Sequence, residues 1–129
     1  MYLLRLKKIK GSKCLYGVEN STHENLTYLA DFLEDFGMPI EDTRQDVENF
    51  FKNSLRKKLV GDEVSITKRE NLVFIVPSYV DDIEQCLYLS MDVAYQIIKE
   101  YWRIKEKCPE EIILKLDENM ENPIIEIIS

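Results

Sequence analysis

Seven apolar or small residues in the second half of the chain are spaced alternately four and three positions apart. They are Ile83, Leu87, Ser90, Ala94, Ile97, Tyr101 and Ile104. Because an α-helix has about 3.6 residues per turn, this spacing places all seven on one helical face. Ser78 is a suitable N-cap, Asp81 and Asp82 suit the first turn, and the segment from Lys105 to Pro109 ends the pattern. The sequence therefore predicts a long helix that must bury one face against a sheet or another helix.

A shorter helix is predicted near the N-terminus. Ser21 and Glu24 have the spacing of a capping box, and Gly37 followed by Pro39 is a typical helix stop. The apolar residues between them follow helical spacing: Leu26, Leu29, Ala30, Leu33 and Phe36.

A second helix is predicted to start at Asp42, with Gln45 at the capping-box position. Lys57 and Lys58 would lie in its last turn, where cations stabilise the helix dipole, and Gly61 would end it. Its apolar face would consist of Val47, Phe50, Phe51, Ser54, Leu55 and Leu59. The connection between the two helices is short, which favours an antiparallel or steeply crossed pair.

Strand patterns occupy most of the remaining chain. Alternating or continuous apolar residues with turn signals between them mark residues 2–10, 13–18, 63–68, 72–76, 112–116 and 124–128. The run from Leu72 to Val76 is apolar throughout, which predicts a central strand buried on both faces, and Pro77 closes it.

The predicted element order is β-β-α-α-β-β-α-β-β. This order indicates an α+β fold with a mainly antiparallel sheet of up to six strands and three helices on one face. With 129 residues, the chain has the length of a single domain, residues 1–129.

The N-terminus and the cysteines bear on the compartment. The charges of the N-terminal segment follow its short apolar stretch, the reverse of a secretory signal, and no apolar run is long enough to cross a membrane. We therefore expect a cytoplasmic protein. Cys14, Cys86 and Cys108 are odd in number and far apart, so we expect reduced, buried thiols rather than a disulfide framework.

Catalytic and cofactor motifs are not evident in the sequence. The single histidine, His23, falls in the predicted first turn of the first helix, outside any nucleophile-elbow pattern. One histidine and three scattered cysteines are a poor source of zinc ligands, and the four glycines are too dispersed for a phosphate-binding loop. We therefore expect no enzyme, no cofactor and no metal site.

Charge is distributed very unevenly along the chain. The net charge is −7, which disfavours nucleic acids and anionic membranes as partners. Residues 1–18 contain five basic residues and no acidic one, whereas residues 31–48 contain seven acidic residues and one arginine. The sequence predicts an acidic partner-binding patch formed by Asp31, Glu34, Asp35, Glu41 and Asp46, with Asp42 set aside as a helix cap. A solvated helix face is the alternative interpretation.

A second candidate surface lies on the predicted long helix. Tyr88, Asp92, Tyr95 and Lys99 follow one another at helical spacing. A face that mixes tyrosine with acidic and basic residues is typical of an interface rim, so Tyr88, Asp92 and Tyr95 join the partner-binding candidates.

These observations favour a small acidic protein that binds and neutralises a basic protein. Immunity proteins against bacterial nuclease toxins and phage-encoded inhibitors of host defence are the general types, because an acidic surface can occupy a basic cleft. One alternative is a small enzyme or ligand-binding domain with a site between helices and sheet. Another is a homodimeric structural subunit joined through a strand edge or the long helix.

Overall fold

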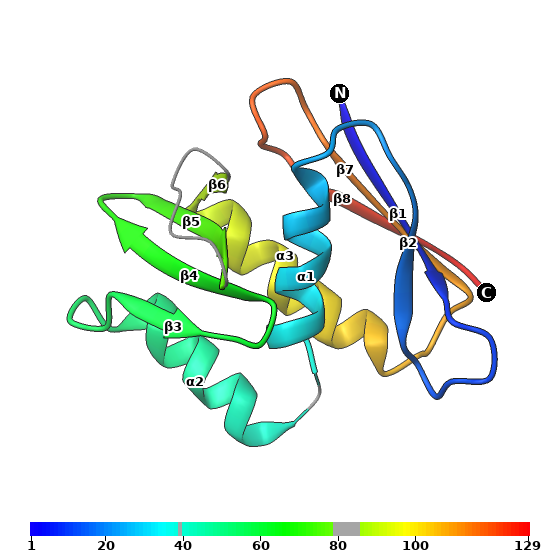
Figure 1. Ribbon diagram of the computed structural model, residues 1–129, viewed down its shortest axis with the longest axis horizontal. Coiled ribbons are helices and arrows are strands. Elements are labelled where there is room, and N and C mark those ends of the chain that lie inside the picture. The colour runs from blue at the N-terminus through cyan, green and yellow to red at the C-terminus, as the bar shows by residue number, and fades with distance from the viewer. Residues whose placement is uncertain (39, 79–85) are drawn as a thin grey trace.

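The computed structural model describes residues 1–38, 40–78 and 86–129. Within these residues the chain is an α+β fold with two four-stranded antiparallel sheets and three helices (Figure 1). The elements are β1 (Tyr2–Lys8), β2 (Tyr16–Ser21), α1 (Leu26–Phe36), α2 (Glu41–Lys52), β3 (Lys58–Val60), β4 (Val64–Arg69), β5 (Leu72–Pro77), β6 (Leu87–Ser90), α3 (Met91–Lys105), β7 (Glu111–Leu116) and β8 (Ile124–Ile128). The first sheet has the order β2-β1-β7-β8, and the second has the order β3-β4-β5-β6.

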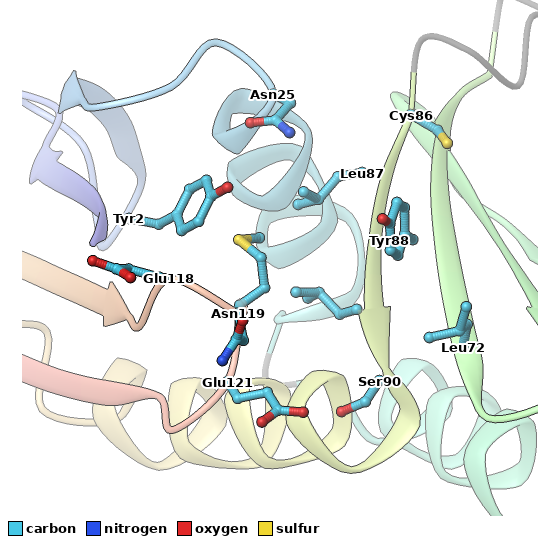
Figure 2. Close-up of a pocket in the computed structure, with 12 residues that line it drawn as sticks. Tyr2, Asn25, Leu72, Cys86, Leu87, Tyr88, Ser90, Glu118, Asn119 and Glu121 are labelled. Atoms are coloured by element: carbon cyan, nitrogen blue, oxygen red, sulfur yellow. The ribbon is translucent and has the colours of Figure 1, made fainter.

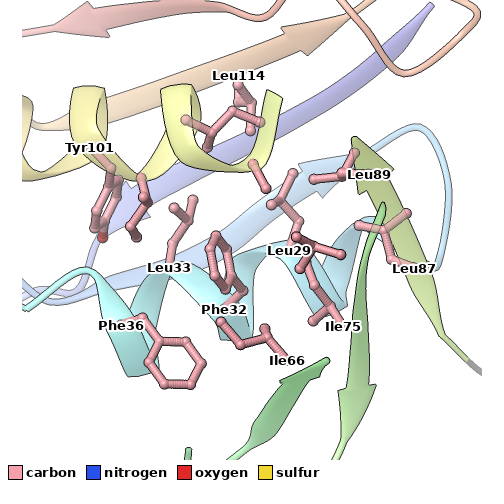
Figure 3. Packing of buried hydrophobic residues seen from close by; sticks show 14 of the residues in the cluster. Leu29, Phe32, Leu33, Phe36, Ile66, Ile75, Leu87, Leu89, Tyr101 and Leu114 are labelled. Atoms are coloured by element: carbon pink, nitrogen blue, oxygen red, sulfur yellow. The ribbon is translucent and has the colours of Figure 1, made fainter. Parts of the chain in front are cut away.

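Helix α1 lies between the two sheets. It contacts β1 and β2 of the first sheet, β4 and β5 of the second, and both other helices. Its apolar residues are therefore buried in two directions at once, and Leu29 and Phe32 are fully enclosed. Figure 3 shows these side chains between those of α3 and β7 on one side and those of the second sheet on the other. A single core results, and it depends on this helix.

The prediction of one sheet with up to six strands is wrong in its count and layering. The chain forms two sheets because β1 pairs with β7, which brings the N-terminal and C-terminal hairpins together as one sheet. Strand β5 is central in the other sheet, but its burial alternates. Val73 and Ile75 face the core, whereas Leu72, Phe74 and Val76 are half-buried on the outer face. The prediction that this strand is buried on both faces is therefore also wrong.

The long helix is confirmed only in its second half. Helix α3 begins at Met91, and the hydroxyl of Ser90 caps it by accepting a hydrogen bond from the N–H of Val93 at 3.2 Å. The preceding residues form β6, where Leu87 is buried as expected, with 3% of its surface exposed, but from a strand. The predicted cap, Ser78, instead donates a hydrogen bond to the carbonyl of Gly61. The other predicted residues of the first turns, 81–83, lie outside the described residues.

Helix α2 ends earlier than predicted because its C-terminus is capped by a residue from another element. The ammonium group of Lys68, on β4, donates hydrogen bonds to the carbonyls of Phe50 and Asn53. The chain then leaves the helix and pairs as β3 with β4, so Leu59 is buried from a strand. Leu55, predicted to lie on the apolar helix face, is 86% exposed.

Helix α1 begins later than predicted and ends where predicted. Ser21 is the last residue of β2, and Asn25 occupies the N-cap position without a side-chain capping hydrogen bond. Gly37 ends the helix, and its N–H donates to the carbonyl of Leu33 at 2.8 Å. A Cβ atom at Gly37 would lie 2.5 Å from the ring of Tyr101, so this position requires glycine.

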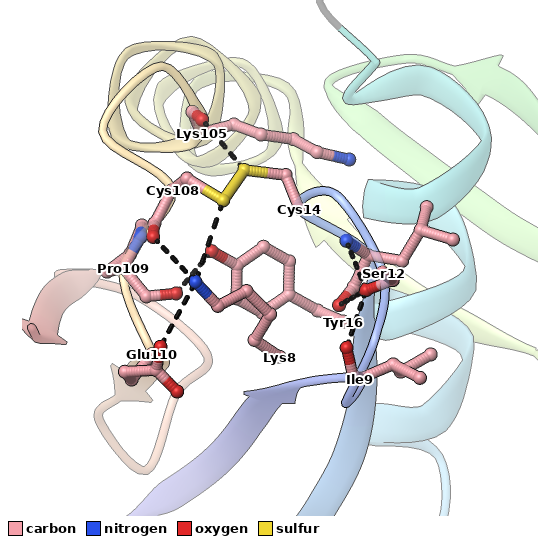
Figure 4. A network of polar contacts seen from close by, with 10 residues as sticks. Lys8, Ile9, Ser12, Cys14, Tyr16, Lys105, Cys108, Pro109 and Glu110 are labelled. Carbon is pink, nitrogen blue, oxygen red and sulfur yellow. Dashed lines mark hydrogen bonds and ion pairs between the residues drawn. A yellow bond between two sulfur atoms is a disulfide. The ribbon is translucent and has the colours of Figure 1, made fainter.

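A disulfide joins Cys14 to Cys108, which corrects the prediction of reduced thiols at these two positions. The bond links the β1–β2 connection to the connection between α3 and β7, with a Cα–Cα distance of 5.3 Å (Figure 4). Beside it, the hydroxyl of Tyr16 donates to the carbonyl of Pro109 at 2.5 Å. Because disulfides persist mainly in oxidising compartments, the bond does not support the predicted cytoplasmic location.

Truncation of the central helix side chain should be costly. Phe32→Ala removes a fully buried ring from α1, so we expect the free energy of unfolding to fall by about 3–5 kcal/mol in urea titrations followed by circular dichroism. Glu34→Ala, on the exposed side of the same helix, should change it by less than about 0.5 kcal/mol. Equal effects of the two substitutions would contradict the central position of α1.

Loss of the disulfide should destabilise the protein. The two cysteines are 94 residues apart, so the bond restricts the unfolded chain strongly. We expect Cys14→Ser/Cys108→Ser to lower the free energy of unfolding by about 2–5 kcal/mol, and Cys86→Ser to have a smaller effect. Alkylation of the unfolded, unreduced protein should modify Cys86 alone; modification of all three cysteines would disprove the bond.

Candidate functional site: an acidic groove

A groove opens between the end of α1, helix α2 and the β3–β4 turn. Its volume is about 210 Å³, and the carboxylates of Asp35, Asp46 and Asp62 line it. The remaining lining residues are Phe36, Thr43, Leu59, Val60 and Gly61, so neither lysine nor arginine contributes. We call this site the acidic groove.

Asp35 holds the groove together. Its Oδ2 atom accepts hydrogen bonds from the N–H groups of Glu63 at 2.8 Å and Val64 at 2.9 Å, which ties the last turn of α1 to the β3–β4 turn. A Cβ atom at Gly61 would lie 2.6 Å from the same oxygen, so glycine is required for this approach. The close contact brings Asp62 and Glu63 beside the acidic face of α1.

One carboxyl of the acidic face of α1, that of Asp31, is harder to ionise than a free aspartate. Partial burial, followed by the charges of Glu63, Glu34 and Asp35, raises the pKa of Asp31 from 3.8 to about 6. In the described part of the chain, the ion pairs involve none of these four residues and neither of the groove residues Asp46 and Asp62. The groove therefore presents uncompensated negative charge.

Two of the five acidic residues predicted from α1 and α2 line the groove: Asp35 from α1 and Asp46 from α2. Asp31 and Glu34, also on α1, line a separate cavity with Tyr101 and Lys105 of α3, although the charge of Glu63 reaches Asp31. Glu41 does not line the groove: its side chain borders another cavity on α2 and accepts a hydrogen bond from Gln45 at 3.5 Å.

One element of the groove and the position of Asp42 differ from the predictions. The acidic pair Asp62–Glu63 comes from the β3–β4 turn, which was predicted only as the boundary between a helix and a strand; the signal was the pair of acids directly after Gly61. Asp42 is not the N-cap of α2, because Ile40 occupies that position, so the reason for setting Asp42 aside was wrong.

The predicted tyrosine surface is divided between two elements. Tyr88 lies on β6, is 58% exposed and packs against Phe74 with ring centroids 5.8 Å apart. Tyr95 lies on α3, stacks on Phe51 of α2 at 4.9 Å and has the ammonium group of Lys99 4.2 Å from its ring. Asp92 is exposed in the first turn of α3. The three do not form one helix edge, because the helix begins after Tyr88.

A larger cavity, of about 400 Å³, lies between the two sheets (Figure 2). It is lined by residues 86–90 on one side, residues 118–121 of the β7–β8 loop on the other, and Tyr2, Asn25 and Leu72. The Oδ1 atom of Asn25 is buried and accepts no hydrogen bond from the described residues. We call this site the inter-sheet cavity.

His23 lies beside this region on the surface. Its Nδ1 atom is 2.9 Å from the hydroxyl of Thr22, and its ring packs against Tyr2 with centroids 4.2 Å apart. The same Thr22 hydroxyl accepts a hydrogen bond from the N–H of Leu3 at 2.9 Å, so Tyr2 and Thr22 together orient the imidazole at the edge of the first sheet.

Comparisons with protein families, with curated proteins and with solved structures find no match to this chain. Within residues 1–38, 40–78 and 86–129, no helix is long and apolar enough to cross a membrane. The same residues contain no cluster of three or more His, Cys, Asp or Glu side chains placed to hold a metal ion.

The raised pKa of Asp31 should make stability depend on pH. Because the folded protein binds more protons at this carboxyl than the unfolded chain between about pH 4 and 6, the free energy of unfolding should fall as pH rises through this window. Asp31→Asn should remove that slope and stabilise the protein at neutral pH by up to about 1 kcal/mol after solvent screening. Urea titrations from pH 4 to 7 provide the measurement, with Asp42→Asn as the exposed control; an unchanged slope in Asp31→Asn would contradict the assignment.

Proposed function

We propose that the protein binds a basic protein and neutralises it, as an inhibitor or immunity-type protein does. The observation that carries the proposal is the acidic groove, in which three carboxylates from three elements surround a volume of about 210 Å³ without a basic residue among the lining. A site of this kind favours an inserted cationic side chain from a partner.

Arginine is the best anchor for this groove. Its planar guanidinium group can bind carboxylates on more than one side, and its aliphatic stem can pack on Phe36 and on Val60, which is 67% exposed. Buried arginine anchors are frequent hot spots of protein interfaces. The net charge of −7 adds long-range attraction, which speeds association with a basic partner at low salt.

Charge reversal in the groove should weaken partner binding. We expect Asp46→Lys/Asp62→Lys to slow association with the authentic partner by at least tenfold at low ionic strength and to reduce the dependence of the rate on salt. Asp35 is left intact because its carboxylate supports the fold. The partner is first captured from the native host at low and high salt, identified by mass spectrometry, and then studied by surface plasmon resonance.

The matched control is Glu24→Lys/Glu70→Lys, which changes the net charge equally at exposed positions outside the groove. It should reduce the association rate less than the groove variant, because only the groove variant alters the contact itself. Equal effects of both variants on the association rate would show that the acidic groove acts only through the net charge and does not contact the partner. Unchanged binding by the groove variant, with the fold intact by circular dichroism, would overturn the proposal.

A further inference from the structure

Among residues 1–38, 40–78 and 86–129, strand β6 is the last strand of the second sheet, and its backbone pairs with β5 alone. No described strand covers its other edge. One residue beyond the pair Leu72–Ser90, the N–H of Met91 donates to the carbonyl of Asn71 at 2.8 Å. Asn71 and Met91 therefore extend the β5–β6 pairing as a hydrogen-bonded pair. Because hydrogen-bonded and non-hydrogen-bonded pairs alternate between antiparallel strands, Phe74 and Tyr88 form a non-hydrogen-bonded pair. The N–H and C=O of Tyr88 therefore point away from β5, toward the open edge.

The inter-sheet cavity runs along this open edge. Residues 86–90, which include all of β6, line it consecutively, and Figure 2 shows Tyr2, Glu118 and Asn119 on the opposite side. No hydrogen bond from another described residue reaches the outward backbone groups of Tyr88. The four residues of β6 offer about 13 Å of edge, enough for a short extended segment.

The opposite side of the cavity carries negative charge. Glu118 and Glu121 are exposed in the β7–β8 loop, and the residues that line the cavity include neither lysine nor arginine. The Asn25 amide, whose buried Oδ1 lacks a hydrogen-bond donor among the described residues, lies on the same cavity. An occupant with backbone donors and cationic side chains would match the outward backbone of β6, the acidic side chains of the β7–β8 loop and the Asn25 amide.

We propose that β6 receives an extended, lysine- or arginine-containing segment of a partner protein as a fifth strand of the second sheet. The added strand exchanges backbone hydrogen bonds with Tyr88, and its basic side chains lie beside Glu118 and Glu121. The site is distinct from the acidic groove, since Asn25 precedes the first turn of α1 and Asp35 lies in its last turn, about 15 Å away along the helix. Either site can fail its test without affecting the other.

The test uses the whole protein and a blocked hexapeptide of alternating lysine and valine. Titration by two-dimensional ¹H–¹⁵N NMR should show saturable shifts confined to residues 86–90 and 118–121, and the amide hydrogen of Tyr88 should exchange at least tenfold more slowly in the complex. The same peptide with glutamate in place of lysine should bind at least tenfold more weakly. Shifts located elsewhere, or equal affinity for both peptides, would overturn the proposal.

Two protein variants separate the backbone contribution from the charge. Tyr88→Pro removes the outward N–H without removing a hydrogen bond to β5, so it should weaken binding at least tenfold, while Tyr88→Val should retain binding within about threefold. Glu118→Lys/Glu121→Lys should weaken binding of the lysine peptide and strengthen binding of the glutamate peptide.

A modified peptide keeps the test decisive if Tyr88→Pro does not fold. Methylation of the backbone nitrogens on one edge of the lysine peptide removes the donors that strand addition requires and leaves the protein unchanged. The methylated peptide should bind at least tenfold more weakly. Binding equal to that of the parent peptide would show that charge alone holds the peptide and would overturn strand addition.

Discussion

The burial of α1 between two sheets is the interaction on which the rest of the structure depends. Neither four-stranded sheet has a second sheet packed directly on its inner face, so the apolar side chains of both meet those of α1 and α3. A helix that is apolar on more than one side is stable only when it is enclosed. Leu29, Phe32 and Leu33 satisfy this condition, and they connect two hairpin systems that come from distant parts of the chain.

Both candidate sites are positioned by the ends of this helix. At its C-terminal end, Asp35 binds the β3–β4 turn and thereby gathers the carboxylates of the acidic groove. At its N-terminal end, Asn25 lies on the cavity that borders β6. Asp35 combines a structural role with a contribution to the negative potential, because its Oδ2 atom accepts two backbone hydrogen bonds while its carboxylate lines the acidic groove. A rigid central helix holds both surfaces in place.

Much of the secondary structure could be predicted, and the errors share a physical origin. The N-terminal and C-terminal hairpins, the end of α1 at Gly37 and the second half of α3 follow local patterns that tertiary contacts leave unchanged. The errors at β3 and β6 arose where apolar spacing suits both a helix and a strand. Leu59 and Leu87 had to be buried in either case, and pairing with a neighbouring strand decided the conformation. The disulfide was missed because a separation of 94 residues gives no local signal.

The sequence by itself determined the α+β class, the buried faces of α1 and the second half of α3, and an acidic surface on the last turns of α1. These properties depend on periodicity and composition, which act within a few residues. Only the tertiary structure decided that the strands divide into two sheets, that Asp62 and Glu63 join the acids of α1, and that β6 borders a cavity with an open edge. Each of these depends on contacts between segments distant in sequence, such as Asp35 with the β3–β4 turn, and such contacts are selected by packing of the whole chain rather than by local preference.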